Sequence, residues 1–187
     1  MNSYEMWNKD HIKIAISGKS GCGNTTITKM LAQKLSLRQI NYTFRDIAKE
    51  KNMDFHEFYE IAVKDHYWDK YLDNKQIEMA SSGRCVLGSR LAIWLFKEAN
   101  FRVYLHASEE VRAKRIHKRE GGTLEQVIER TQLRDHNDWK RYNEIYGIDI
   151  NNWDFVDLEI DAGTNSPEDI VDIILNKLEA CSSRFTK

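Results

Sequence analysis

The stretch AISGKSGCGNTT, residues 15–26, decides the fold and raises the first question about function. An apolar run leads into it, and an amphipathic helix is predicted over residues 25–35. Gly18, Gly21 and Gly23 allow backbone conformations that aim successive N–H groups at an anion near the start of that helix. A strand, a glycine-rich loop and a helix in this order predict a phosphate-binding loop, and an ordinary strand–helix turn is the alternative.

The loop fits the pattern G-x-x-x-x-G-K-[ST] everywhere except at its lysine. Asn24 stands at that position, and an asparagine can donate a hydrogen bond but carries no charge. Thr25 occupies the position whose hydroxyl usually binds magnesium. Lys19, the second residue of the loop, lies where some P-loop ATPases carry an additional phosphate-binding lysine. We therefore expect Lys19 to supply part of the missing charge, with a solvated surface lysine as the alternative.

Three further loop residues are expected beside the phosphates: Ser20, Cys22 and Thr26. Because helix N-termini lower the pKa of thiols, we expect Cys22 to be reactive and to be protected by bound ATP.

The composition predicts one domain with a substantial core in a cytoplasmic protein. The chain has 187 residues, of which 41% are hydrophobic. A net charge of −1 excludes a global attraction to nucleic acid or to an anionic membrane. Neither a signal-peptide pattern nor a membrane-spanning apolar stretch is present in the sequence. The three cysteines show no zinc-ligand spacing, which indicates free thiols in a reducing compartment.

Short apolar runs alternate with longer amphipathic segments along the chain. Strands are expected at residues 12–18, 40–44, 85–89, 101–107 and 155–162. Helices are expected at residues 25–35, in pieces over 45–82, at 90–99, at 108–146 with a break at Gly121 and Gly122, and at 167–180 behind the N-cap Ser166. The alternation predicts an α/β fold with a parallel sheet covered on both faces. In such a sheet, ligands bind beyond the carboxyl ends of the strands.

A basic helix is the second candidate for phosphate binding. Arg130, Arg134, Asp138 and Arg141 are separated by four, four and three residues and therefore share one helix face. Guanidinium groups bind phosphate oxygens in pairs, and a mobile helix that carries them can close over a nucleotide. A solvated helix with surface salt bridges is the alternative, but a phosphate loop in the same chain favours the phosphate role.

Two arginines follow predicted strands on the ligand side of the sheet. Arg45 comes directly after the second strand, and Arg90 comes shortly after the third. Structural caps or surface ion pairs are the alternatives for both. Farther along, Asp69 and Gln76 belong to a helical segment that could present acceptors and an amide to a base, although a solvated face is the usual outcome.

Taken together, the chain resembles nucleoside monophosphate kinases of the P-loop class, most closely the short cytidylate kinases of archaea and some bacteria. The resemblance covers residues 13–178 and depends on five segments in a fixed order. These are ISGKSGCGNTT (16–26), FRDIAKEKNMDFHEF (44–58), LGSRLAIW (87–94), ASEEVRAKRIHKREGG (107–122) and RYNEIYGIDI (141–150).

The resemblance implies a single P-loop kinase domain over residues 1–187, with a five-stranded parallel sheet in the order 2-3-1-4-5. Its parts would be a core at 12–44, 83–119 and 150–180, a monophosphate-binding region at 45–82 and a lid at about 120–146. It also implies transfer of the γ-phosphoryl group of ATP, with Mg²⁺, to CMP or dCMP. Small nucleotides would be the partners, without nucleic acid or membrane, and we expect a monomer while leaving a dimer open.

The resemblance assigns roles to residues on both sides of the reaction. Arg45 and Arg90 would hold the α-phosphate of the acceptor, while Gln76 and neighbours such as Asp69 would lie near its base. Arg112 or Arg115 would contact the donor side. The lid residues match the family in this way: Arg134 and Arg141 would stabilise the transferring phosphoryl group, and Asp138 would contact the acceptor nucleotide.

Two departures from the family pattern concern charge. Asn24 replaces the loop lysine, and Gly88 and Ser89 replace the acidic residue and the glycine of an E-G-R block. That carboxylate often orients magnesium through water, and losing one electrostatic group of this kind costs about two to three powers of ten in rate. The alternatives are therefore a kinase for UMP or another small acceptor, and a nucleotide-binding regulator with little turnover.

Overall fold

The computed structural model describes residues 12–181, in which five strands and eight helices alternate. The strands are β1 (Lys13–Gly18), β2 (Arg38–Ile40), β3 (Cys85–Gly88), β4 (Phe101–His106) and β5 (Leu158–Asp161). The helices are α1 (Asn24–Leu35), α2 (Phe44–Glu50), α3 (Phe55–Ala62), α4 (Tyr67–Ser81), α5 (Ala92–Leu95), α6 (Glu109–Glu120), α7 (Leu124–Tyr146) and α8 (Pro167–Ala180).

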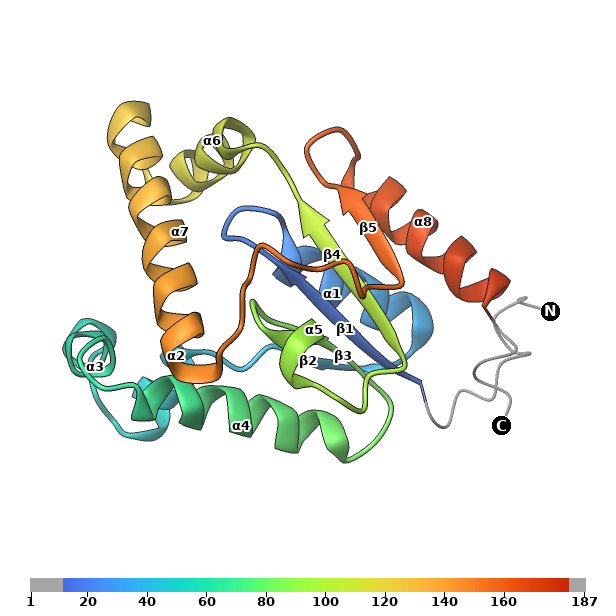
Figure 1. The fold of residues 1–187 in the computed structure, drawn as a ribbon, viewed down its shortest axis with the longest axis horizontal. Helices are drawn as coiled ribbons and strands as arrows, with labels where there is room; N and C mark the ends of the chain where they lie inside the picture. The colour runs from blue at the N-terminus through green and yellow to red at the C-terminus, as the bar shows by residue number, and fades with distance from the viewer. Residues whose placement is uncertain (1–11, 182–187) are drawn as a thin grey trace.

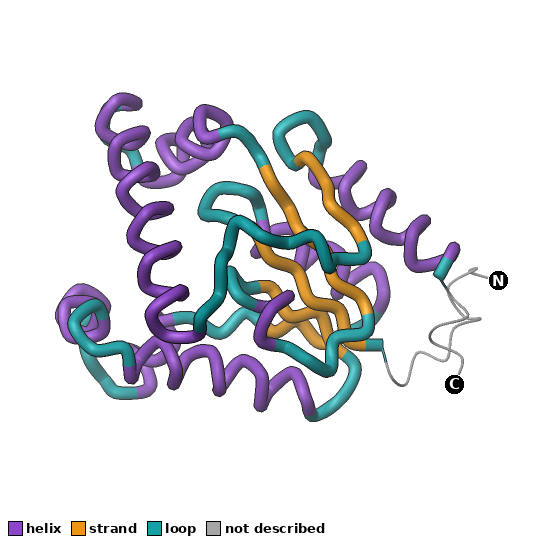
Figure 2. The backbone as a smooth tube through the Cα atoms, viewed as in Figure 1, coloured by secondary structure: helices purple, strands orange, loops and turns teal. Residues whose placement is uncertain are grey.

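The strands form one sheet in the order β2-β3-β1-β4-β5, and every neighbouring pair is parallel. This confirms the predicted fold class and strand order. Figures 1 and 2 show helices around the central sheet, with the carboxyl ends of β1 and β4 directed toward α6 and α7. The long helix α7 therefore lies at the edge of the sheet where a parallel sheet binds ligands.

The central strand β1 is covered on both faces, as its unbroken apolar sequence requires. Ile14 and Ile16 join a core cluster that includes residues of α1 and α8. Ala15, one residue out of phase, joins the cluster on the opposite face with Leu87 and Tyr104. The buried hydroxyl of Ser17 accepts a hydrogen bond of 3.1 Å from the backbone N–H of residue 93, so this polar side chain is satisfied inside the core.

Two smaller apolar clusters lie outside the main core. One joins α2, α3 and α4 and is centred on Ile47 and Phe58. The other joins α6 to α7 through Ala113, Ile116 and Val127. Each cluster packs its helices against one another, so α2–α4 and α6–α7 form two small helical units beside the sheet. The boundaries of the monophosphate-binding region and the lid remain predictions.

The second strand was predicted too late in the sequence. The structure places β2 at Arg38–Ile40, whereas Phe44 is already the first residue of α2. Thr43 and Asp46 form a capping box in which the N–H of Thr43 donates to the Asp46 carboxylate over 2.8 Å. The apolar residues in this stretch thus serve two clusters, since Ile40 packs in the sheet core and Phe44 packs against Phe58.

The helix predicted over residues 90–99 is also shorter than expected, because α5 covers only Ala92–Leu95. The guanidinium group of Arg102 donates hydrogen bonds to the carbonyl oxygens of Ile93, Phe96 and Lys97. Those bonds satisfy the carbonyls without a further helical turn, so the chain can leave the helix and enter β4. The predicted start of the last helix is confirmed, with Ser166 as N-cap and Pro167 as first residue.

No helix in the described range, residues 12–181, has the length and apolar character needed to cross a bilayer.

Close packing between α1 and β3 explains why Gly88 lacks a side chain. A Cβ atom built on Gly88 would lie 2.0 Å from the Oγ1 atom of Thr28 and 2.9 Å from its Cβ atom. Thr28 is fully buried, so its side chain has little space in which to move. The volume next to β3 that a larger residue at position 88 needs is therefore occupied by Thr28.

We predict that Gly88→Ala lowers the free energy of unfolding by about 1–3 kcal/mol, because the added methyl group overpacks a full core. In a Thr28→Ala background the same change should cost clearly less, since the closest clashing atom is gone. Urea unfolding of the two single variants and the double variant measures this coupling. Thr26→Ala, an exposed change on the same helix, is the control. Equal costs of Gly88→Ala in all backgrounds would contradict the packing explanation.

Candidate active site

The phosphate loop connects β1 to α1 at the ligand edge of the sheet. Gly21 and Gly23 adopt φ angles of +88° and +100°, which a side chain would disfavour. At Gly21 there is a second reason for glycine, because an added Cβ atom would lie 2.9 Å from the Cβ atom of Arg112. The loop is thus shaped by backbone freedom and by close contact with α6.

The first turn of α1 differs from the first turns of most other helices in the described chain. Asp54, Ser108 and Ser166 cap α3, α6 and α8 by accepting hydrogen bonds from first-turn N–H groups. The N-cap of α1 is Gly23, which offers no side-chain acceptor, and no acidic residue lies in the first turn. The N–H groups of this turn therefore lack a side-chain acceptor and can serve an anion such as phosphate.

The side chain of Asn24 braces the loop. Its Nδ2 atom donates a hydrogen bond of 2.6 Å to the carbonyl oxygen of Gly18, at the opposite end of the loop. Its Oδ1 atom is buried and has no hydrogen-bond partner among the described residues. Asn24 consequently closes the loop on itself and adds no charge at the position of the usual lysine.

Lys19 projects across the loop toward α7. Its Nζ atom lies 3.9 Å from the Oδ2 atom of Asp135, a residue to which the sequence analysis gave no role. The same carboxylate receives two hydrogen bonds from Arg112, of 3.2 and 2.7 Å. Asp135 therefore connects the phosphate loop, α6 and α7, the helix predicted to belong to the lid.

Arg112 and Arg115, the two residues expected on the donor side, hold backbone carbonyls at the loop. Arg112 donates to the carbonyl oxygens of Ala107 and Ser20 over 3.3 and 3.2 Å. Arg115 donates to the carbonyl of Ala162 over 2.6 Å and reaches that of Gly21 at 3.4 Å. Both arginines thereby fix the loop against neighbouring elements, and contact with the donor nucleotide remains a prediction.

Four of the predicted site residues meet in one ion-pair network. Asp138 is buried and pairs with Arg90 through one oxygen and with Arg141 through the other, the latter at 3.0 Å. Arg141 also lies 3.4 Å from the carboxylate of Asp69 on α4. Burial raises the pKa of Asp69 against the opposing charge of Arg141. The network joins the β3–α5 segment to α7 and to α4.

Three other predicted site residues lie outside this ion-pair network. Arg134 is exposed, and it forms no ion pair within residues 12–181. Arg45 is exposed and stacks its guanidinium group over the ring of Phe55 at 3.9 Å, outside the network of Asp138. Gln76 is buried and donates to the backbone carbonyl of residue 42, so its amide nitrogen holds α4 in place.

One small pocket lies between the phosphate loop and the ion-pair network of Asp138. It has a volume of about 10 Å³ and is lined by residues of the phosphate loop, of the β3–α5 segment and of α7. Among the lining residues are Gly18, Lys19, Arg90, Asp135, Asp138 and Tyr142. A volume of this size holds about one water molecule, so the pocket as it stands is too small for a phosphate group.

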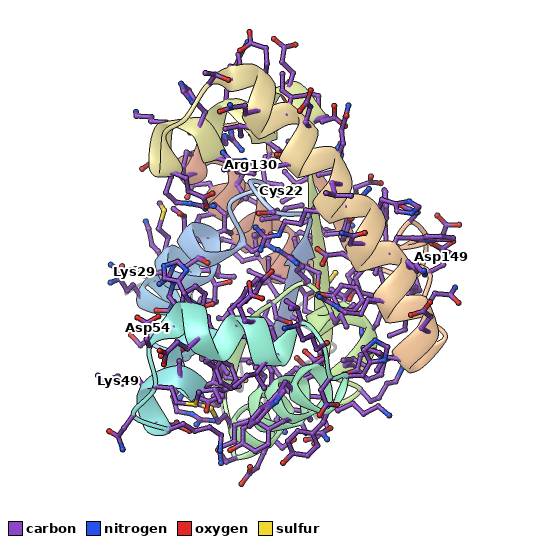
Figure 3. The ribbon with its side chains drawn as sticks, turned by 90° about the vertical axis from the view of Figure 1, so that its left-hand side faces the viewer. Cys22, Lys29, Lys49, Asp54, Arg130 and Asp149 are labelled. Atoms are coloured by element: carbon purple, nitrogen blue, oxygen red, sulfur yellow. The ribbon has the colours of Figure 1, made fainter. Side chains whose placement is uncertain are left out.

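The surroundings of Cys22 argue against the reactive thiol expected from the sequence. The residue is only 2% exposed and packs in the core cluster beneath the loop. Burial raises the pKa of its thiol to about 11, an effect larger than the opposing influence of Arg112. In Figure 3, Cys22 lies in the loop ahead of α1, with Arg130 of α7 drawn above it. A thiol at a helix N-terminus is activated only when it also faces solvent.

Comparisons with known proteins identify the family of the chain. A family model described as the Cytidylate kinase-like family matches residues 13–164. The chain belongs to that family. The resemblance and the enzyme class predicted from the sequence are thereby confirmed.

The similarity to curated cytidylate kinases extends over about 90% of the chain. "Cytidylate kinase 2" of Borreliella burgdorferi is 49% identical over 172 residues, covering 90% of this chain and 96% of the relative. "Cytidylate kinase" of Archaeoglobus fulgidus is 40% identical over 171 residues, covering 90% and 95%.

Solved structures with the same fold have lower sequence identity. A deoxyadenosine kinase from M. mycoides with bound dATP matches with a TM-score of 0.56 and 20% identity, covering 89% of this chain and 99% of that one. A shikimate kinase from Aquifex aeolicus matches with a TM-score of 0.55 and 16% identity, covering 92% and 99%. These structures support the kinase fold of this family member.

We predict that Cys22 resists alkylation in the folded protein. At pH 8 a thiol with a pKa of about 11 is almost entirely protonated, and the thiolate is the reactive form. Iodoacetamide labelling followed by mass spectrometry should show half-buried Cys181 modified first. Buried Cys85, whose pKa is raised to about 11 as well, should react as slowly as Cys22 and serves as the control. Rapid labelling of Cys22 that ATP suppresses would contradict this prediction.

Proposed function

We propose that the protein transfers the γ-phosphoryl group of ATP to CMP or dCMP. The observation that carries this proposal is that one pocket is lined both by the phosphate loop, at Gly18 and Lys19, and by the ion pair of Arg90 with the buried Asp138. A kinase of this type needs a donor cradle and an acceptor clamp that face one another, because catalysis consists of positioning and charge stabilisation.

On the donor side, the uncapped first turn of α1 and the glycines of the loop would hold the β- and γ-phosphates. The exposed Thr25 hydroxyl, in the first turn, fits a magnesium ion that takes few protein ligands and completes its shell with phosphate and water. When bound, the ion neutralises charge on the β- and γ-phosphates.

On the acceptor side, Arg90 would bind the phosphate of the monophosphate, and Arg134 and Arg141 would approach the transferring group from the lid. Arg90 and Arg141 share the carboxylate of Asp138, and this closeness supports a role for both at one acceptor. An acceptor phosphate oxygen attacks the γ-phosphorus, the bond to the β-phosphate oxygen breaks, and ADP leaves. No covalent enzyme intermediate is needed.

A second candidate function is nucleotide binding with little turnover. Two observations favour it: Asn24 is committed to the carbonyl of Gly18, and the space beside Gly88 is filled by Thr28. The positive charge of the loop lysine and the negative charge of the E-G-R acid, both part of the family pattern, are therefore missing from their usual positions. Lys19 and the lid arginines must provide enough positive charge if phosphoryl transfer is to be fast.

The test is a coupled ADP-release assay with ATP, Mg²⁺ and a panel of monophosphates. We expect CMP and dCMP to be the best acceptors, with UMP and AMP slower. Arg134→Ala and Arg141→Ala should lower kcat by more than they raise KM, because these arginines act mainly on the transition state. Arg119→Ala removes an exposed arginine of α6 and is the matched control. Measurable ATP binding without turnover on any acceptor would favour the regulator.

We predict that Lys19→Ala lowers kcat/KM for ATP by the equivalent of about 2–3 kcal/mol, the scale of a lost charged contact to phosphate. Asn24→Lys should restore part of that loss in the double variant, because it returns a charge to the usual position. Steady-state kinetics on the two single variants and the double variant measure this directly. If Lys19→Ala matches the wild type, the compensating charge comes from elsewhere or is absent.

A further inference from the structure

Asp135 is the carboxylate through which the lid touches the phosphate loop. We propose that Asp135 is a positioning residue that fastens Arg112 to the lid and holds Lys19 until nucleotide phosphate displaces it. Lys19 would then alternate between two anionic partners, the carboxylate and the phosphate. This inference rests on the proposed function, and it adds a residue to which neither the sequence analysis nor the family resemblance gave a role.

The two cations that Asp135 contacts are held very differently. The Arg112 side chain is 5% exposed and makes a two-pronged contact with Asp135, with distances of 3.2 and 2.7 Å. It also donates to the carbonyls of Ala107 and Ser20, so little of its donor capacity is left for a ligand. Arg112 is therefore a fixed strut between α6, the loop and the lid.

Lys19 is the movable partner. Its side chain is 30% exposed, and its Nζ atom stands 3.9 Å from Asp135, near the outer limit for an ion pair. A lysine side chain is flexible, and a loose and partly exposed pair costs little to break. Nucleotide phosphate bound in the loop would compete well for this ammonium group while the Arg112–Asp135 pair stays intact.

Of the carboxylates that line the pocket, Asp135 is the one placed to hold Lys19. The second carboxylate that lines the pocket is Asp138, and both of its oxygens are engaged, one by Arg90 and one by Arg141. At the end of β3, position 88 carries no carboxylate. Asp135 is thus the pocket carboxylate that faces Lys19.

Opposite effects on binding and on turnover follow from this arrangement. Asp135→Asn removes a negative charge beside the loop and releases Lys19, so ATP should bind more tightly. The same change weakens the tie between Arg112 and α7, so the closed lid is held less firmly and kcat should fall. A purely structural defect would weaken binding and turnover together.

The experiment measures the dissociation constant of ATP, with and without Mg²⁺, by titration calorimetry on the full chain. We expect Asp135→Asn to bind ATP roughly three- to tenfold more tightly than the wild type, with kcat reduced about tenfold or more. Glu129→Gln, which removes an exposed carboxylate from the same helix, is the control and should leave both values unchanged. Asp135→Glu, which keeps the charge, should recover most of kcat.

The Lys19→Ala background decides whether the effect passes through Lys19. There, Asp135→Asn should tighten ATP binding much less than in the wild type, because no ammonium group is left to release. If Asp135→Asn tightens ATP binding equally in both backgrounds, the proposal is overturned. It is also overturned if Asp135→Asn weakens the binding of Mg²⁺-ATP and leaves the binding of Mg²⁺-free ATP unchanged, because the carboxylate would then act through the metal.

Unchanged ATP affinity in Asp135→Asn also overturns the inference and leaves the proposed kinase function standing. Failure of the wild type to bind ATP at all would instead remove the proposed function. Thermal unfolding separates loss of fold from loss of function. If Asp135→Asn is unfolded, ATP affinity is compared between Lys19→Ala and the wild type instead. A Lys19→Ala variant that binds ATP as tightly as the wild type then overturns the proposal.

Discussion

The burial of β1 on both faces is the constraint on which the rest of the structure depends. A strand covered on both sides can meet solvent and ligands only at its ends, so chemistry is confined to the carboxyl edge of the sheet. There the chain turns through glycines into a helix whose first turn has no capping side chain. The anion site is therefore a direct result of how the central strand enters α1.

Charge at this edge is arranged by pairing across elements. Asp135 and Asp138 extend from α7 and meet cations of the loop, of α6 and of the β3–α5 segment. Buried ion pairs gain little net stability, because desolvation offsets most of the attraction. The pairs also differ in strength: Arg112 holds Asp135 through two hydrogen bonds, whereas Lys19 reaches it only at 3.9 Å, and this looser contact is the one that we propose nucleotide phosphate replaces.

The two departures from the family pattern have different physical causes. Asn24 is small enough to turn inward and bond to Gly18, so the loop keeps its shape while losing a charge. At position 88, packing is the cause, since Thr28 fills the space where a side chain would begin. In the proposed reaction, charge neutralisation would therefore fall to Lys19 and to the arginines of α7, whose long side chains could reach phosphate from neighbouring elements.

The sequence by itself determined the parallel sheet, the phosphate loop and the arginine face of α7, because periodicity and local motifs act over short distances along the chain. It misplaced β2, since apolar residues at 40 and 44 pack in different clusters. Only the tertiary structure decided that the thiol of Cys22 faces the core and that Asp135 meets Lys19 and Arg112. Those outcomes depend on which elements pack together, and contacts between residues about 20 to 120 positions apart leave no local pattern in the sequence.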